Sequence, residues 1–342
     1  MIRLLIADDS SLTRTVLRDL LSRDPEIQIV AEVENGLTAV QKTAELRPDL
    51  IIMDVIMPVM DGLTAVAEIM ADIPTPILVL SANIDPSDSL NAFNAIRLGA
   101  LDVMAKPEGI VTEAFNEVAA QLIARIKELA RVRVIHHFRR QRETLLPTPP
   151  PDGQHRILAI GASTGGPKAI LHLLKALPAD IGASILIVQH ISSGFAPGFA
   201  AWLHQESDLT VRIAQEGEIL QPGIALVAPN HRHMVVQKGR IHLNDAVPRN
   251  CCRPSVDVLF ESLATHDLAP SVVALLLTGM GRDGAAGMAA LYRRGAHTIA
   301  QNETSCAVFG MPKSAISLNA AHQVLSLEEI PAAVTRLLHP VF

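Results

Sequence analysis

The chain has 342 residues, a length that predicts about two domains of roughly 150 residues each. Hydrophobic residues make up 49% of it and charged residues 19%, which excludes a disordered chain. The net charge of −6 gives no attraction to nucleic acid or to an anionic membrane, so neither is expected as a partner. No apolar run approaches the ~20 residues of a membrane-spanning helix, and the N-terminal run turns acidic at Asp8, too early for a signal peptide. We therefore expect a cytoplasmic protein without membrane insertion.

The aromatic and cysteine contents point to aliphatic cores and a reducing compartment. Aromatic residues make up only 3% of the chain, as expected for parallel sheets that are buried on both faces. The three cysteines, Cys251, Cys252 and Cys306, match neither a disulfide framework nor a zinc spacing. We interpret them as small apolar residues that fill space.

Residues 1–130 alternate between strand-like and helix-like stretches. The apolar runs are Ile2–Ala7, Ile27–Val33, Leu50–Met53, Ile77–Leu80 and Ala100–Met104. The stretches with helical period are Leu12–Leu21, Leu37–Leu46, Leu63–Met70, Ser87–Leu98 and Thr112–Arg131. This alternation predicts a doubly wound α/β fold, in which helices cover both faces of a parallel sheet. Ligands of such sheets bind at the edge where the strands have their carboxyl ends.

Polar side chains gather at that edge. Asp8 and Asp9 end the first run, Asp54 ends the third, Ser81 the fourth, and Lys106 follows the fifth. Three carboxylates at one edge repel one another unless a cation joins them, and Mg²⁺ prefers such hard oxygen ligands. A lysine and a hydroxyl opposite them would complete a phosphoryl pocket. Four successive edges of this kind are not typical of ordinary solvated strand ends.

The motifs at these positions resemble the receiver domain of bacterial two-component response regulators. They are Ala7-Asp8-Asp9, Met53-Asp54-Val-Ile-Met-Pro58-Val-Met-Asp61-Gly62, Leu80-Ser81-Ala82 and Ala105-Lys106-Pro107. The resemblance implies that Asp54 receives a phosphoryl group from a partner histidine kinase, with Asp8, Asp9 and Asp54 around Mg²⁺. Ser81 and Lys106 would contact the phosphoryl oxygens. Many receivers have an aromatic switch residue three positions before the lysine. Here that residue is Val103, so output through a swinging aromatic ring is not expected, and output through the Ser81 loop and the adjacent surface stays open.

The second half repeats the α/β pattern with an insertion. Apolar runs at Ile157–Ile160, Ser184–Val188 and Val272–Leu277 predict strands of a buried sheet. Met234–Val236 and Ile241–Leu243, on either side of Lys238-Gly239, predict a β-hairpin. The predicted helices are Pro254–Leu263, with the proline inside the first turn, Ala285–Arg293 and Ile330–Leu338.

The stretch Ile157–Ile170 predicts a strand, a tight turn and a helix. Ser163 follows the apolar run directly, and Gly165-Gly166-Pro167 opens the helical pattern. A side chain at this place lies near the exposed N–H groups of a helix N-terminus. The stretch by itself fits a nucleophile and a phosphate-binding loop equally well.

Two further polar residues follow apolar runs in this half. His190 comes after Ser184–Val188, and Asp283 comes after Val272–Leu277. In a parallel sheet these two residues and Ser163 meet at one edge, where they would supply a nucleophile, a general base and an orienting carboxylate. The glycines around Met280 leave N–H groups that suit an oxyanion hole, although Met280 itself fits a packing role equally well.

Motifs throughout this half resemble the catalytic domain of the chemotaxis receptor methylesterases. They are Ile160-Gly-Ala-Ser-Thr-Gly-Gly-Pro167, Val188-Gln-His190, Ala228-Pro229, Arg253-Pro-Ser-Val-Asp257, Leu277-Thr-Gly-Met-Gly-Arg-Asp-Gly284, Thr298-Ile-Ala-Gln301 and Val308-Phe-Gly-Met-Pro312. The resemblance implies a carboxylic ester hydrolase with Ser163 as nucleophile, His190 as base and Asp283 as orienter, and it places Thr164 and Met280 at active-site positions. Its substrates would be glutamate methyl esters on chemoreceptor helices, and glutamine deamidation by the same triad is a further option. No cofactor is expected for the ester hydrolysis.

The two resemblances together predict three parts: residues 1–125 as receiver, 126–154 as helix end and Pro-rich linker, and 155–342 as methylesterase domain. They imply that the unphosphorylated receiver blocks the esterase and that phosphorylation of Asp54 relieves the block. The segment Ile191–Phe195 departs from the family pattern, so receptor preference stays open. We expect a monomer. Two alternatives are a paralogue that acts on a non-motility receptor and a phosphorylation-gated binding module without turnover.

Overall fold

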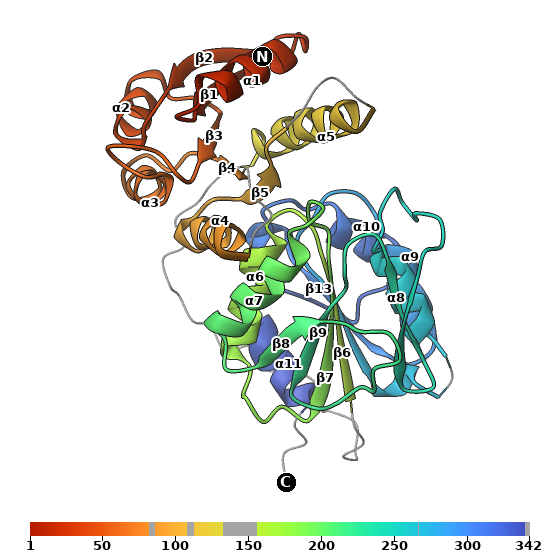
Figure 1. Cartoon of the computed structure of the whole chain (residues 1–342). Coiled ribbons are helices and arrows are strands. Elements are labelled where there is room, and N and C mark those ends of the chain that lie inside the picture. Colours follow the sequence, from red (N-terminus) through yellow and green to blue (C-terminus); the bar gives the residue numbers. More distant parts are fainter. Residues whose placement is uncertain (82–85, 108–112, 133–155, 266, 339–342) are drawn as a thin grey trace. The chain divides into compact units, whose positions relative to one another are not determined.

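The computed structural model describes residues 1–81, 86–107, 113–132, 156–265 and 267–338 (Figure 1). The chain folds as two compact units, Met1–Arg139 and Arg140–Phe342. The last helix of the first unit ends at Leu129, so the predicted linker over 126–154 begins within a helix. Its residues from 133 onward lie outside the described part of the chain.

The first unit is a five-stranded parallel sheet in the order β2-β1-β3-β4-β5. The strands are β1 (Ile2–Ala7), β2 (Ile27–Val33), β3 (Leu50–Asp54), β4 (Ile77–Ser81) and β5 (Asp102–Ala105). The predicted strands agree with these to within two residues at every end. Asp54 and Ser81 are therefore the last residues of their strands, as the sequence pattern predicts.

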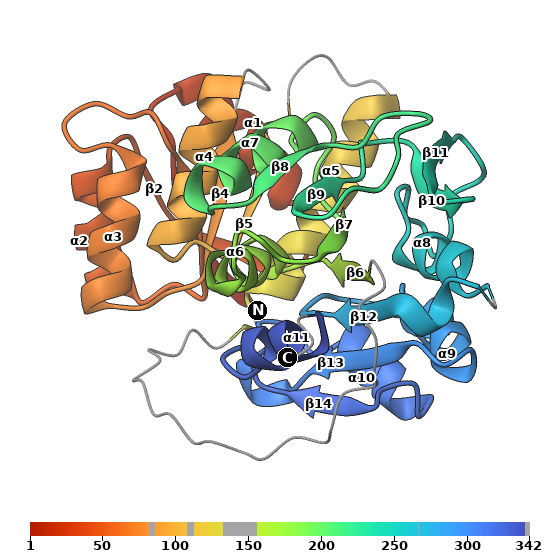
Figure 2. The same cartoon turned by 90° about the horizontal axis from the view of Figure 1, so that it is seen from below.

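Helices cover both faces of this sheet. They are α1 (Ser11–Leu21), α2 (Gly36–Leu46), α3 (Gly62–Asp72), α4 (Pro86–Leu98) and α5 (Glu113–Leu129). Buried leucines and isoleucines of α1 and α5 share one core with β1, β3 and β4. Figure 2 shows α2, α3 and α4 grouped together, and contacts from α2 to α3 and from α3 to α4 agree with it. The predicted doubly wound fold is confirmed.

The second unit is a seven-stranded sheet in the order β14-β13-β12-β6-β7-β9-β8, and all of its pairs are parallel. The strands are β6 (Arg156–Ala162), β7 (Ala183–Gln189), β8 (Thr210–Ile213), β9 (Ile224–Val227), β12 (Val272–Leu276), β13 (His297–Gln301) and β14 (Gln323–Leu325). The sequence pattern predicts the three central strands β12, β6 and β7, whose apolar runs are long. The outer four, with three to five residues each, are missing from the prediction.

The helices of this unit form two layers. They are α6 (Gly166–Ala176), α7 (Ala196–Glu206), α8 (Val256–Leu263), α9 (Ala285–Arg293), α10 (Met311–Ser317) and α11 (Ile330–Leu338). Figure 1 shows α6, α7 and α11 on one side of the strands and α8, α9 and α10 on the other. The predicted hairpin is present as β10 (His233–Gln237) and β11 (Arg240–Asn244), and it packs against α8 (Figure 2).

One helix start differs from the prediction. The helix expected at Pro254 begins at Val256, with Ser255 in extended backbone as its N-cap residue. Pro254 therefore precedes the helix instead of lying in its first turn. As a result, the N–H groups of the first turn that have no partner within the helix include those of Val256 and Asp257.

The register of the central strands fixes where the candidate residues lie. Gly161 of β6 pairs with Leu276 of β12, and Ala162 of β6 pairs with Gln189 of β7. Ser163 and His190 therefore follow directly on the ends of neighbouring strands. Among the described helices, none is both long and apolar enough to cross a membrane.

Candidate active site

Ser163 is held by its backbone at the carboxyl end of β6. Its N–H donates to the Thr278 carbonyl at 3.0 Å, and its carbonyl accepts the N–H of Gly166 at 2.8 Å. Between them, Gly165 has a φ of +75°, a conformation that suits glycine, and α6 begins at once with Pro167 in its first turn. The predicted strand, tight turn and helix are confirmed. The side chain of Ser163 thus emerges between a strand end and a helix N-terminus.

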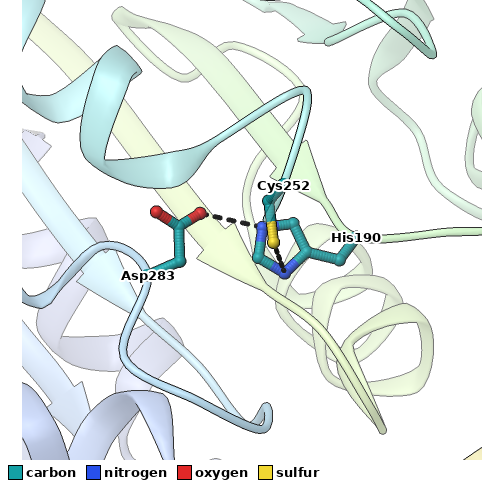
Figure 3. Close-up of side chains that lie close together, drawn as sticks. All are labelled: His190, Cys252 and Asp283. Carbon is teal, nitrogen blue, oxygen red and sulfur yellow. Dashed lines mark hydrogen bonds and ion pairs between the residues drawn. The ribbon is translucent and has the colours of Figure 1, made fainter. Parts of the chain in front are cut away.

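The imidazole of His190 has two side-chain partners, Asp283 at the edge of the ring and Cys252 over its face (Figure 3). Its Nε2 is 2.9 Å from Oδ2 of Asp283, and its Nδ1 is 3.8 Å from Sγ of Cys252. Because Asp283 engages Nε2, the nitrogen that remains for proton exchange with another group is Nδ1. His190 and Asp283 therefore have the relation that a general base and its orienting carboxylate require.

Asp283 is buried and receives four hydrogen bonds besides the one from His190. The backbone N–H of Val256 donates at 2.6 Å and that of Asp257 at 3.2 Å, so the carboxylate caps the N-terminus of α8. The Ser255 hydroxyl donates at 2.6 Å and the Asn250 amide at 2.9 Å. The carboxylate is fixed in position by a helix end and a loop, and it can turn only one oxygen toward the imidazole.

These contacts shift both pKa values of the pair in the direction of the ion pair. Burial raises the pKa of Asp283, but the hydrogen bonds from His190, Ser255 and Asn250 outweigh it and lower the pKa to about 2. Burial lowers the pKa of His190, but its contacts with Asp283 and Cys252 outweigh it and raise the pKa to about 9. Both shifts favour the ion pair of imidazolium and carboxylate.

Gln189 joins the backbones of the two strand ends. Its side-chain amide donates to the carbonyl of Ser163 at 2.8 Å and to the carbonyl of His190, also at 2.8 Å. The same side chain is buried, and its Oε1 has no partner among the described residues. Gln189 thereby fixes the separation of the backbone at Ser163 from that at His190.

The remaining predicted positions are spread around this pair. Within the described residues no hydrogen bond joins the Ser163 hydroxyl to His190, although both lie at the same sheet edge. Thr164 is fully buried, and its carbonyl accepts the hydroxyl of Thr278 at 2.9 Å. Met280 is 58% exposed and lines a cavity of ≈ 250 Å³ together with His190 and Asp283.

The backbone N–H groups around Met280 differ in whether they already donate a hydrogen bond. The N–H of Gly279 donates to the carbonyl of Val308 at 3.0 Å. In the part of the chain that the structure describes, the N–H groups of Met280 and Gly281 donate to no protein acceptor. These two, and not the first, are the donors that an oxyanion could engage at the wall of the cavity.

The first unit brings its own predicted residues together. The ammonium of Lys106 lies 2.7 Å from Asp8 and 2.8 Å from Asp54, and one oxygen each of Asp8, Asp9 and Asp54 lies within 4.8 Å of the others. Ser81 ends the neighbouring strand, and its carbonyl accepts the N–H of Lys106 at 2.9 Å. An all-carboxylate set of this kind fits Mg²⁺. Val103 is buried within β5, opposite Val79 of β4.

The comparisons with known proteins identify the family of each unit. The sequence pattern of the CheB methylesterase family matches residues 158–334, and that of the response regulator receiver domain matches residues 4–113. The chain belongs to the CheB methylesterase family. A relative from Anaeromyxobacter dehalogenans (strain 2CP-C), named protein-glutamate methylesterase/protein-glutamine glutaminase 2, is 43% identical over 98% of this chain and 97% of its own length.

Other members of the family match over comparable lengths. A Myxococcus xanthus protein-glutamate methylesterase/protein-glutamine glutaminase 4 is 38% identical over 98% of this chain and 96% of its own length. The solved catalytic domain of the CheB methylesterase from Thermotoga maritima is 35% identical, with a TM-score of 0.52, and covers 54% of this chain and 100% of that domain. The family, the two parallel α/β domains and their order are as predicted.

Sequence reasoning missed the residues that hold the CheB-family site together. Asn250, Ser255 and Gln189 carry hydrogen bonds that no apolar periodicity reveals, although the motif Arg253–Asp257 includes Ser255. The interpretation of the cysteines as space-fillers is wrong for two of them. Cys251 is exposed, and Cys252 lies against the imidazole of His190. A loop residue gives no periodic signal from which this contact could be predicted.

Proposed function

We propose that this chain is a phosphorylation-regulated protein-glutamate methylesterase that hydrolyses glutamate methyl esters on the cytoplasmic helices of a chemoreceptor. The observation that carries the proposal is the His190–Asp283 pair beside the strand end that presents Ser163. The names of full-length relatives support the choice of substrate.

In the proposed reaction the Ser163 hydroxyl attacks the ester carbonyl while Nδ1 of neutral His190 takes its proton. A bond forms from Oγ of Ser163 to the carbonyl carbon, and the methoxy group leaves as methanol with the proton that His190 returns. Water, deprotonated in turn by His190, then releases the glutamate carboxylate and restores the hydroxyl. Ser163 and His190 must first approach to hydrogen-bond distance, a change that catalytic pairs commonly undergo on binding substrate.

Two groups assist the proposed transfer. Asp283 holds Nε2 of His190 and balances the imidazolium that forms when Nδ1 takes the proton. The free N–H groups of Met280 and Gly281 would hold the negative oxygen of the tetrahedral state. Met280, exposed at the cavity, then acts through its backbone N–H, and the fully buried Thr164 follows the nucleophile directly in the chain.

The first unit would regulate this reaction through Asp54. A histidine kinase is the proposed phosphodonor, and Asp8, Asp9 and Asp54 would hold Mg²⁺, with Lys106 and Ser81 beside the phosphoryl oxygens. When bound, Mg²⁺ neutralises the charge that builds up as the phosphoryl group arrives. The protein contributes the Asp54 carboxylate, whose pKa is raised by burial despite its bond to Lys106.

Methanol release from a methylated chemoreceptor tests the proposal. We expect turnover by the full-length chain, a several-fold increase with a small-molecule phosphodonor, and no detectable turnover by Ser163→Ala. Asp54→Asn serves as the matched control, since it should retain the basal rate and lose the response to phosphodonor. Turnover by Ser163→Ala would exclude the assigned nucleophile, and a folded wild-type chain without turnover would favour the binding-module alternative.

Glutamine deamidation is a second candidate activity of the same site. The relatives carry glutaminase in their names. An amide releases ammonia only if the leaving nitrogen is protonated, and a His190 with a pKa of about 9 is a sufficient acid for that step. Ammonia release from receptor glutamine, lost together with methanol release in Ser163→Ala, would establish one site for both reactions.

A further inference from the structure

One charged side chain at the cavity beside the candidate base has no task in the proposed reaction. The charged residues that line this cavity are His190, Arg282 and Asp283. His190 and Asp283 bind each other, and the carboxylate accepts further hydrogen bonds from Ser255, from Asn250 and from the start of α8. Because these donors occupy both of its oxygens, the carboxylate does not neutralise Arg282. In the part of the chain that the structure describes, no hydrogen bond or ion pair engages the exposed guanidinium of Arg282.

The loop that carries Arg282 is held on both sides by backbone hydrogen bonds. The carbonyl of Gly279 accepts the N–H of Met311 at 2.8 Å, and the carbonyl of Arg282 accepts the N–H of Ala285 at 3.1 Å, where α9 begins. Between them, Gly281 has a φ of +86°, a conformation that suits glycine. Since the backbone is fixed on both sides, the side chain of Arg282 starts from a defined position at the wall of the cavity.

Arg282 follows directly on the two N–H groups that are proposed for the oxyanion. These belong to Met280 and Gly281 and would hold the carbonyl oxygen of the reacting ester. Consecutive Cα atoms are about 3.8 Å apart, so the side chain of Arg282 begins one to two residue lengths from these donors. On an α-helix, side chains three or four positions apart have their Cβ atoms about 5–6 Å apart. When a helical substrate places its ester at the two N–H groups, the neighbouring turn of that helix is therefore within reach of the guanidinium.

We propose that Arg282 is a specificity-determining residue, which binds a carboxylate of the substrate helix three or four positions from the ester. A guanidinium pairs with a carboxylate through two parallel N–H donors, whereas an uncharged ester or amide gives a weaker pairing. The inference rests on the proposed function, because it takes the substrate to be a receptor helix with esterified glutamates. Hydrolysis of one ester creates a carboxylate, so an ester one turn away becomes a better substrate.

The overall charge of the chain makes a local cation important for an acidic partner. The net charge of −6 does not attract an acidic helix at long range. Recognition of such a helix then depends on positive groups at the site itself, and Arg282 is an arginine that no acidic side chain of the described residues occupies. Because the guanidinium is exposed, salt screens its attraction to a carboxylate. The preference for an acidic neighbour should therefore weaken as the ionic strength rises.

Two fluorescent helical peptides are the probes for binding. Each carries one glutamate methyl ester, and the positions four residues before and after it are glutamate in one peptide and glutamine in the other. Full-length Ser163→Ala, kept with a phosphodonor, should bind the glutamate peptide ~5- to 10-fold more tightly. Adding Arg282→Gln should abolish this preference. Adding Arg293→Gln, which changes an exposed arginine at the far end of α9, should keep it. Equal binding of the two peptides, or a preference that survives Arg282→Gln, would overturn the inference.

Methanol release from the glutamate peptide separates binding from catalysis. With Ser163 present, Arg282→Gln should raise KM by the same ~5- to 10-fold and leave kcat within ~2-fold, since the carboxylate is bound equally in the ground state and the transition state. Arg282→Lys, which keeps the charge and loses the paired donors, should lie between the two. A loss of kcat at unchanged KM would refute the role in binding. A wild-type chain without methanol release would refute the proposed function, while the binding of the two peptides still decides on Arg282.

Discussion

Both units have a carboxylate at the carboxyl edge of a parallel sheet, but the pKa values of the two carboxylates shift in opposite directions. In the receiver unit, burial and the neighbouring charge of Asp8 raise the pKa of Asp54 in spite of the bond to Lys106. In the methylesterase unit, hydrogen-bond donors lower the pKa of Asp283, which is also buried, to about 2. Burial is the largest single influence on both, so the donor set decides the direction of the shift.

The difference follows from what surrounds each carboxylate. Asp283 accepts two backbone N–H groups at the start of α8 and two side-chain donors, all of which favour its charged form. Asp54 shares one ammonium with Asp8 and lies close to a further carboxylate. A carboxylate that stays charged suits the role of orienting His190. A carboxylate that lies beside other carboxylates, as Asp54 does, suits a site to which a cation and a phosphoryl group bind. The sheet topology thus determines at which edge the carboxylates lie, and the hydrogen-bond donors around each carboxylate determine its charge state and role.

Exchanging each carboxylate for an amide should give the largest effect and separate the two roles. Asp283→Asn removes the charge that holds the tautomer of His190, and we expect methanol release to fall by ~10³- to 10⁴-fold with or without phosphodonor. Asp54→Asn should change only the response to phosphodonor. The rates are compared at saturating receptor, and the fluorescence of Trp202, which is buried in α7, controls for folding. Equal losses in both variants would contradict the division of roles.

The ion pair should also contribute to stability within a defined pH window. The pKa of His190 is raised from 6.5 to about 9, so its contribution is complete below 6.5 and is lost as the pH rises through 9. That of Asp283 is lowered from 3.8 to about 2, so its contribution is present above 3.8 and is lost as the pH falls through 2. The shift of His190 corresponds to roughly 3 kcal/mol.

Urea unfolding followed through Trp202, the only tryptophan of the chain, measures this contribution. The free energy of unfolding of the wild type should exceed that of His190→Gln by the largest margin between pH 4 and 6.5, and the margin should shrink as the pH passes 9. A difference between wild type and variant that stays constant from pH 5 to 10 would show that the pair is not charged in the resting protein.

Removing one donor of Asp283 should give an intermediate effect. The hydroxyl of Ser255 donates to the carboxylate at 2.6 Å, and hydrogen bonds to charged groups contribute about 1.5–3 kcal/mol. We expect Ser255→Ala to lower kcat ~10-fold or more with little change in KM, and to move the pH profile. Ser262→Ala is the matched control and should retain kcat; it removes a hydroxyl near the other end of α8 that donates to the Leu259 carbonyl and accepts the N–H of Val236. Similar losses in both would indicate a general effect on the helix.

The smallest expected effect is a change in the pH at which the rate increases when Cys252 is replaced. An unperturbed histidine predicts an increase near pH 6.5, but the surroundings of His190 move the increase toward pH 9, because the base must be neutral to accept a proton. Contact with Cys252 is one cause of the raised pKa, so Cys252→Ala should move the midpoint of kcat/KM to lower pH. A midpoint near 6.5 in the wild type would show that Asp283 does not hold the imidazolium.

Much of the fold could be predicted because the buried strands of a parallel α/β sheet are apolar runs that alternate with stretches of helical period. The long apolar runs of β12, β6 and β7 stand out, and Ser163 and His190 follow two of them directly. The outer strands β8, β13 and β14 mix polar with apolar residues, which obscures the strand pattern, whereas the apolar β9 was missed although its run is as long as β5. The start of α8 was predicted too early because Pro254 fits a first helical turn as well as the loop before it.

The sequence by itself determined the two-unit α/β plan, the receiver and methylesterase family, and the strand ends at which Asp54, Ser163 and His190 lie. These depend on apolar runs and short motifs, which are visible in the sequence itself. Only the tertiary structure decided that Asn250, Cys252 and Ser255 surround the pair of His190 and Asp283. Those contacts join loops that are tens of residues apart, and hydrogen bonds between loops depend on the packing of α8 against the sheet, which no local pattern encodes.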